Sequence, residues 1–205
     1  MNKENEVEST SQKSRPAWHV LAGRVARFFG IHFYDLYYCE RALSSSVEPV
    51  VPSVPTRVRL ATTEDLNRII CRIGGETCRK FDHNAAIDSI CYVALHEDTV
   101  TGYIWVNRQI IDLVGMYVVK LPARHSFCHN AFVFPEYRRK KIYQYLRHAV
   151  CSEMYASGCV SIACFVDKAN TQPIKVLKRQ GMKFHNAPVL KLPFVNPIHF
   201  CRVLA

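Results

Sequence analysis

The sequence lacks three features that would each assign it to a definite class of protein. It contains no run of about 18 apolar residues, which excludes a membrane-spanning helix. Its nine cysteines form no C-x-x-C pair and are odd in number, which argues against a complete disulfide framework. It holds only eight glycines, none of them between Gly115 and Gly158. Glycine lets a backbone turn approach a ligand closely, so a turn in that stretch must do so without it.

The cysteine usage and the first residues together predict an intracellular protein. Residues 1–15 are polar and have no apolar segment of the kind found in a secretory signal peptide. Nine thiols without paired spacing are typical of a cytoplasmic protein, in which they stay reduced. The nine histidines and nine cysteines give no full ligand set with zinc-site spacing. We therefore expect a cytoplasmic protein without a bound metal.

Acidic residues are scarce relative to basic ones, and the imbalance lies in one block. The chain has 27 Lys and Arg against 17 Asp and Glu, a formal net charge of +10. Residues 136–191 hold eleven of the basic residues and three of the acidic ones, a net charge of +8. Such a block is either a solvated helix face or the binding site of an anion. Aromatic residues are not interleaved with the basic ones, so we expect no nucleic-acid partner.

The chain divides into three predicted parts. Residues 1–15 are expected to be a disordered tail. Residues 16–56 combine an amphipathic helical arm at Trp18–Phe29 with a Pro-rich linker, and the aromatic stretch Ile31–Leu43 between them fits either a strand or a helix. Residues 57–205 form the main domain. The arm can pack on that domain, or it can contact a membrane surface or a second copy of the chain, which would make the protein membrane-peripheral or a homodimer.

Short apolar strands alternate with amphipathic helices in the main domain, which predicts an α/β fold in the broad sense that includes α+β. Thr62 with Asp65 three residues later is a helix-start signal, and Gly74–Gly75 is a stop signal. The apolar segment 109–119 is ambiguous. The expected strands are 57–61, 89–95, 102–106, 126–134, 159–166, 182–192 and 198–204, and the expected helices are 62–73, 141–157 and 170–181.

A strand, a tight basic turn and a long helix follow one another at residues 131–146. The turn places four consecutive cations, Arg138 to Lys141, directly before the helix. Backbone N–H groups and the positive end of the helix dipole point at such a turn, which favours an anion there. A phosphate-bearing ligand explains this arrangement better than a solvated helix face does.

The same stretch resembles the GNAT N-acetyltransferase superfamily. The segment Val133-Phe-Pro-Glu-Tyr-Arg138 matches the strand end Val-x-Pro-x-Tyr-Arg that members commonly have, and residues 170–182 match the family's Asn-to-Gly helix segment in spacing. Val58–Asp65 and Val100–Ile104 are similar to its first strand and central meander. The resemblance covers residues 57–191. It implies a GNAT-like fold: a central mixed, mostly antiparallel sheet flanked by helices, here with an N-terminal helical arm.

The resemblance also implies an acyl donor, acetyl-CoA or another acyl-CoA. The donor would lie in a V-shaped opening between the strand that ends at Val133 and the strand Cys159–Val166. Backbone amides of the turn would cradle its pyrophosphate, and an amine acceptor would attack the thioester directly, without a covalent enzyme intermediate. The donor-binding residues implied are Phe132, Val133, Arg138, Arg139, Lys140, Lys141, Ile142, Tyr143 and Asn170.

The turn departs from the family pattern at its small positions. Lys141 stands where the family has its first glycine, Tyr143 stands at the final small position, and Arg139 is charged where glycine is also common. Leu177 replaces a tyrosine that many members use as general acid. The chain is therefore either an acyl-CoA-dependent N-acyltransferase or a catalytically reduced GNAT-like protein that binds a ligand or regulates. A protein that binds RNA or an anionic surface through the basic block is the third alternative.

His129 lies on the strand before the turn and is the candidate general base, because histidine titrates near neutrality. The alternative is a histidine hydrogen-bonded within the core. Cys128 beside it is a candidate nucleophile, although no feature of the sequence marks it as reactive. The acceptor side of the family is built by its first helices and final hairpin, here residues 66–81 and 182–201. The apolar insert 110–119 and the arm suggest a small-molecule or a lipid- or sugar-linked amine as acceptor.

Overall fold

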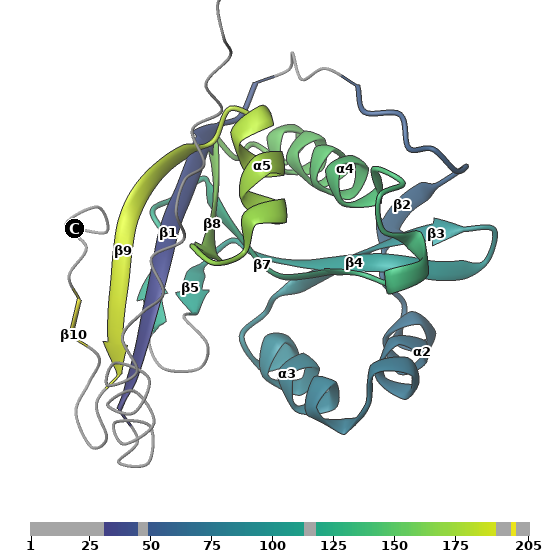
Figure 1. The fold of residues 1–205 in the computed structure, drawn as a ribbon, viewed down its shortest axis with the longest axis horizontal. Helices are drawn as coiled ribbons and strands as arrows, with labels where there is room; N and C mark the ends of the chain where they lie inside the picture. The colour runs from purple at the N-terminus through teal and green to yellow at the C-terminus, as the bar shows by residue number, and fades with distance from the viewer. Residues whose placement is uncertain (1–30, 45–48, 113–117, 192–197, 200–205) are drawn as a thin grey trace, which may run out of the picture.

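An eight-stranded mixed sheet forms the centre of the molecule, with strand order β10-β9-β1-β8-β7-β4-β3-β2 (Figure 1). The computed structural model describes residues 31–44, 49–112, 118–191 and 198–199. The tail and the arm helix expected at 1–15 and 18–29 lie outside these residues. The strands of this sheet are β1 (His32–Ala42), β2 (Arg57–Leu60), β3 (Ile90–His96), β4 (Thr99–Asn107), β7 (His125–Val133), β8 (Ser161–Asp167), β9 (Lys183–Lys191) and β10 (Ile198–His199).

Helices cover both faces of the sheet, which confirms the predicted fold class. The helices α4 (Ile142–Ala156) and α5 (Thr171–Arg179) lie on one face, and α2 (Thr63–Ile73) and α3 (Gly75–Ala86) lie on the other (Figure 1). All neighbouring pairs of the described strands in this sheet are antiparallel except β7 and β8. None of the helices within the described ranges is long and apolar enough to cross a membrane.

The first strand corrects the expected domain boundary. β1 lies between β8 and β9 and pairs with both, so that Cys39 is opposite Cys164 on one side and Phe184 on the other. The start of the main domain at residue 57 is therefore too late, because residues 32–42, expected in the arm, form a central strand. Helices and neighbouring strands bury parts of both faces of β1, which removes the alternation that marks a half-buried strand.

The described second half of the linker leads to β2, an edge strand of the sheet. Residues 49–56 contain no helix or strand, as predicted, and connect toward β2. The Ser53 N–H donates to the carbonyl oxygen of Lys140 at 3.0 Å. The linker is thus attached to the basic turn that precedes α4.

The start of α2 confirms the predicted capping box. The Thr62 side chain accepts from the Asp65 N–H, and the Asp65 carboxylate accepts from the Thr62 N–H at 2.8 Å. Arg59 adds two hydrogen bonds to the same carboxylate, of 2.5 and 3.1 Å. Burial alone would raise the pKa of Asp65, but the hydrogen bonds from Arg59 and Thr62 outweigh it and hold that pKa below its ordinary value.

Two segments differ from the expected elements. α2 ends at Gly74 as predicted, but α3 begins directly at Gly75, where the glycine pair was expected to stop helical structure. The ambiguous segment 109–119 contains the strands β5 (Ile110–Asp112) and β6 (Val118–Lys120), which pair with each other in a separate two-stranded sheet. Residues 113–117 lie outside the described residues.

Candidate active site

The strands β7 and β8 separate in the middle of the sheet. Their parallel pairing begins at His125 opposite Ser161 and ends at Cys128 opposite Cys164. Beyond that pair β7 continues to Val133 and β8 to Asp167 with no register between them. This fork is the opening that the resemblance implied between these two strands.

A bulge in β7 sets the direction of its free end. β4 pairs Tyr103 with Phe132 and Trp105 with His129, so β7 has one residue more than β4 over this stretch. Asn130 lies in the extra stretch and has a left-handed backbone with φ of 46°. On the facing strand, a Cβ on Gly102 would lie 2.8 Å from the Phe132 carbonyl oxygen. Gly102, in the segment Val100–Ile104 that resembles the family's central meander, therefore lets the two strands approach closely at the bulge.

The basic turn has a backbone conformation that normally calls for glycine. Arg139 has a φ of 63° and Lys141 a φ of 60°, and both are left-handed. This conformation costs a side-chain-bearing L-residue roughly 1–2 kcal/mol. Such conformations persist where the surroundings impose them and gather at functional sites. Arg139 and Lys141, two positions where the resemblance implies glycine, therefore carry charged side chains on a left-handed backbone.

The N–H groups of this turn are available to an anion. Within the described residues, those of Arg139, Lys140 and Lys141 donate to no backbone carbonyl. They are followed by the first N–H groups of α4, which have no partner inside the helix. The turn side chains of Arg138, Arg139 and Lys141 are exposed. The positive end of α4 and these cations together form a site suited to a diphosphate.

Arg138 links the turn to the free end of β7. Its Nε donates to the Val133 carbonyl oxygen at 3.2 Å, and its guanidinium lies 5.7 Å from the ring centre of Phe132. The Phe132 ring in turn stacks on Tyr103 at 5.8 Å. The predicted residues Phe132, Val133 and Arg138 are therefore in mutual contact at one side of the fork. Val133 was expected to bind the donor through its backbone, and its carbonyl oxygen already accepts a hydrogen bond from Arg138.

Tyr143 turns its side chain inward toward the fork. Its hydroxyl is hydrogen-bonded to the buried guanidinium of Arg147 and lies within electrostatic reach of Cys128 and Cys164. Burial raises the pKa of Tyr143 to about 12, although Arg147 lowers it in part. The phenol therefore stays protonated at neutral pH. The side chain at the final small position of the family pattern therefore reaches the fork in this chain.

The cysteines at the fork are core residues. Burial raises the pKa of the Cys128 thiol, which disfavours the alternative of Cys128 as a nucleophile. The thiols of Cys39 and Cys164 are hydrogen-bonded to each other, and this bond, with help from Arg147, lowers the pKa of Cys164 while that of Cys39 rises. No signal in the sequence identified the buried cation Arg147 in this cluster of thiols.

His129 lies on the opposite face of the sheet from the basic turn. It is paired with Trp105, which packs with α2 and α3, whereas Cys128 packs under α4. Its Nε2 atom lies 3.0 Å from Ser89 Oγ. The imidazole is half-buried, as is the serine. His129 therefore faces α2 and α3, whereas the basic turn lies on the other face of the sheet.

Asn107 fixes the orientation of the Ser89–His129 pair. The Asn107 Oδ1 accepts the N–H groups of Gln109 and Ile110, both at 2.8 Å, so its Nδ2 must point the other way. That Nδ2 donates to Ser89 Oγ at 3.1 Å. The Ser89 hydroxyl hydrogen is thereby left for Nε2 of His129, which favours the neutral tautomer with its proton on Nδ1. Ser89 and Asn107 carry no motif and were not found from the sequence.

Of the remaining predicted residues, Ile142 begins α4 and is buried, and Asn170 lies on the β8 side. Asn170 is the residue before α5, is exposed, and makes no side-chain cap, while its N–H donates to the Asp167 carbonyl at 2.9 Å. Leu177 is fully buried against α4 and offers no hydroxyl. No group of three His, Cys, Asp or Glu side chains in the described part of the chain is placed to hold a metal ion.

A forked mixed sheet with a left-handed basic turn before a long helix defines an acetyltransferase fold of the GNAT type. The chain belongs to the GNAT family of acetyltransferases: the model described as "Acetyltransferase (GNAT) family" matches residues 61–182. This range contains the fork, the basic turn and α5, and excludes β1.

Two solved structures illustrate the likeness. A GCN5-related N-acetyltransferase from Sphaerobacter thermophilus is 16% identical with a TM-score of 0.52, covering 83% of this chain and 55% of its own. A GNAT-family acetyltransferase from Novosphingobium aromaticivorans is 12% identical with a TM-score of 0.51, covering 78% of this chain and 66% of its own. This chain thus spans little more than half of the Sphaerobacter protein. At these identities the likeness shows the fold. A comparison with curated protein sequences gives no match.

Proposed function

We propose that the protein is an N-acetyltransferase that transfers the acetyl group, or another acyl group, of acyl-CoA to an amine acceptor by direct attack. The observation that carries this proposal is the turn before α4. Arg139 and Lys141 hold left-handed conformations there although neither is glycine. A backbone conformation that is adopted at a cost in stability indicates a functional role. The free N–H groups and the cations of this turn suit a diphosphate.

The described residues fit an acyl-CoA donor on the α4 side of the fork. The N–H groups from Arg139 to Tyr143 would bind the pyrophosphate, and Arg138 would add a charged contact. The free ends of β7 and β8, with Val133 on one and Asn170 beyond the other, would hold the pantetheine arm. When bound, acyl-CoA supplies a thioester carbonyl that an amine can attack.

His129 would act as the general base on the other side of the sheet. Because Ser89 Oγ lies 3.0 Å from Nε2, the proton of the incoming amine would pass through the Ser89 hydroxyl to Nε2. The Tyr143 phenol, protonated at neutral pH, would donate a hydrogen bond at the fork in place of the hydroxyl that Leu177 lacks.

The acceptor would approach from the side of α2 and α3. The β5–β6 hairpin borders the same region, since Ile111 packs with Phe127 of β7. We propose a small-molecule or a lipid- or sugar-linked amine as acceptor. We also propose that the protein acts in the cytoplasm, where its N-terminal arm could rest on a membrane surface or join two copies.

One observation favours a second function, a GNAT-like protein that binds a ligand without turnover. Leu177 is buried where a hydroxyl would serve catalysis, and the Tyr143 side chain occupies space at the fork. Turnover separates the two functions. The full-length chain is incubated with acetyl-CoA and a panel of amines, and CoA release is followed with a thiol reagent. Amine-dependent release supports the acetyltransferase. Binding of acetyl-CoA without release under any acceptor supports the second function.

A further inference from the structure

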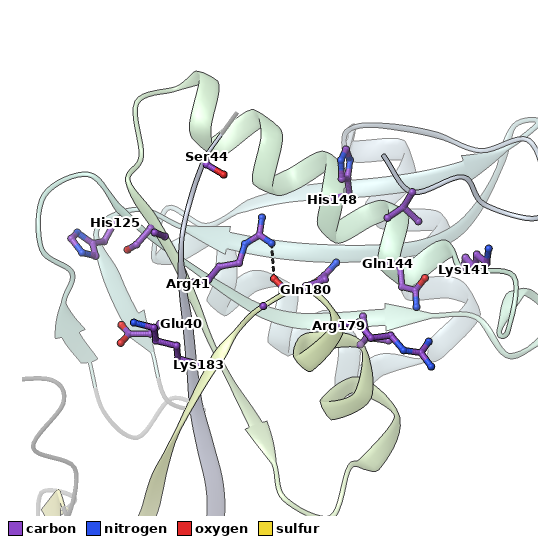
Figure 2. A pocket seen from close by; sticks show the side chains of 15 residues that line it. Glu40, Arg41, Ser44, His125, Lys141, Gln144, His148, Arg179, Gln180 and Lys183 are labelled. Carbon is purple, nitrogen blue, oxygen red and sulfur yellow. Dashed lines mark hydrogen bonds between the residues drawn. The ribbon is translucent and has the colours of Figure 1, made fainter. Parts of the chain in front are cut away.

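A groove lies between α4 and α5, apart from the fork (Figure 2). Its volume is about 920 Å³, within the range of small-molecule sites. One side is lined by Lys141, the residue before α4, and by Gln144 and His148 of α4. Its far end is lined by His125 and Ser161, the first paired residues of β7 and β8, whereas the fork begins after their last pair. The groove therefore meets the basic turn at Lys141 and extends from there away from the fork.

Three cations from three different elements line this groove (Figure 2). Arg41 comes from β1, Lys141 from the basic turn, and Arg179 from the last turn of α5. None of the three forms a salt bridge with a carboxylate in the described ranges. Like charges that share a groove repel one another, so an anion between them would supply the missing counter-charge.

The acidic residue that lines the groove is occupied elsewhere. Glu40 lies with its Oε1 3.3 Å from Nε2 of His185, and the strand register places it opposite Lys183. These three residues form a locally balanced group where β1 meets β9. Among the residues that the structure describes, no carboxylate forms a salt bridge with Arg41, Lys141 or Arg179.

Arg41 is held in place before any ligand arrives. Its Nη1 donates to the Gln180 carbonyl oxygen at 2.7 Å, and its Nε is buried without a hydrogen-bond partner among the described residues (Figure 2). The Gln180 side chain is itself fixed, because its Oε1 accepts from Nε of Arg147 at 2.9 Å. A donor that is already ordered loses little freedom on binding, which favours affinity.

We propose that this groove is a second anion site, which binds a phosphate-bearing small molecule distinct from the acyl donor. Two guanidinium groups and one ammonium group match the oxygens of a phosphate or diphosphate, since a guanidinium can bind two of them at once. Gln144 and His148 add polar groups along the same wall. The groove has room for a ligand of nucleotide size.

The test uses the full-length chain and inorganic tripolyphosphate, followed by isothermal titration. We expect Arg179→Gln to weaken tripolyphosphate binding at the groove at least tenfold while the affinity for acetyl-CoA changes less than twofold. Arg138→Ala, in the turn, should keep the groove event and weaken acetyl-CoA. Lys178→Gln is the matched control, because Lys178 is an exposed neighbour on α5 that does not line the groove, and it should change neither.

Two results overturn the proposal. One is an unchanged tripolyphosphate affinity in both Arg179→Gln and Arg41→Gln, with a melting curve showing that each variant is folded. The other is a loss of CoA affinity in Arg179→Gln that spares dephospho-CoA, because the cations would then bind the 3′-phosphate of the donor itself. The basic turn can bind tripolyphosphate as well, so the groove is identified by the difference between Arg179→Gln and Arg138→Ala. That difference does not require acetyl-CoA binding, so failure of the proposed function leaves this test intact.

Discussion

Cys128 and Cys164 are the last pair of residues that joins β7 to β8 in the sheet. On the next position of β7, His129 faces α2 and α3, while Cys128 itself packs under α4. The fork beyond this pair thus joins two half-sites on opposite faces: the basic turn on one and the Ser89–His129 pair on the other. The proposed reaction needs both, because the donor and the acceptor must meet at the fork.

The conformation of the basic turn predicts an unusual gain of stability. Lys141→Gly should raise the free energy of unfolding by about 1 kcal/mol, because glycine adopts a φ of 60° without a steric cost. Lys140→Gly, one residue earlier and without a left-handed backbone, should lower it by about 0.5–1 kcal/mol. Urea unfolding of both variants measures the difference. Equal losses in the two variants would show that the turn carries no strain at Lys141.

The Arg59–Asp65 contact predicts a pH-dependent contribution to stability. The pKa of Asp65 is lowered in the folded state, so its stabilisation is present above the unfolded pKa and is lost as pH falls through the folded pKa. Asp65→Asn should cost about 2 kcal/mol at pH 7 and progressively less below pH ~4. Glu64→Gln is the control, because the exposed Glu64–Arg68 pair should contribute less than about 0.5 kcal/mol. A loss in Asp65→Asn that is independent of pH would contradict the assignment.

Much of the fold beyond Arg57 follows from local patterns. The capping box at Thr62, the stop at Gly74 and the long helix after Lys141 are set by side chains within a few residues of each other. β1 is different, because its place between β8 and β9 depends on partners more than 100 residues away. No local pattern distinguishes a strand buried on both faces from a helix of the same composition.

The candidate site likewise has a part that the sequence predicts and a part that only the fold brings together. The basic turn and the motif that ends at Arg138 are contiguous in the sequence and were predicted together. Ser89 and Asn107 meet His129 only because β3, β4 and β7 lie side by side, so no spacing rule connects them. The shape of the turn was also beyond sequence reasoning, since neither Arg139 nor Lys141 is a residue that favours a left-handed backbone.

The central place of β1 predicts the outcome of truncation. A chain that begins at residue 45 loses β1 and leaves β8 and β9 without their common partner, so it should not fold. A chain that begins at residue 16 keeps β1 and should fold with an unchanged melting temperature. Circular dichroism and size-exclusion chromatography distinguish the two. A folded, monodisperse chain from residue 45 would show that β1 is not needed for the domain.

The Ser89–His129 pair predicts a kinetic signature once an amine substrate is found. His129→Gln should lower kcat by at least about 100-fold with the KM for acetyl-CoA little changed, because a general base contributes about that much. Ser89→Ala should lower kcat less and shift the midpoint of the pH profile, and Ser89→Thr should restore most of it. His96→Gln, a histidine bonded to the Pro55 carbonyl, is the control. Wild-type kinetics in His129→Gln would remove this residue from the mechanism.

The central claim is that the turn Arg138–Lys141 binds the acyl donor. Titration of acetyl-CoA into the protein tests this claim most directly. We predict saturable binding by the wild-type chain. Arg138→Ala should weaken it on the order of 10- to 100-fold, as expected for one charged hydrogen bond of about 1.5–3 kcal/mol, and Arg57→Ala, on the exposed Asp98 pair, should not. An absence of binding for acetyl-CoA and longer acyl-CoAs, or an unchanged dissociation constant in Arg138→Ala, would contradict the assignment.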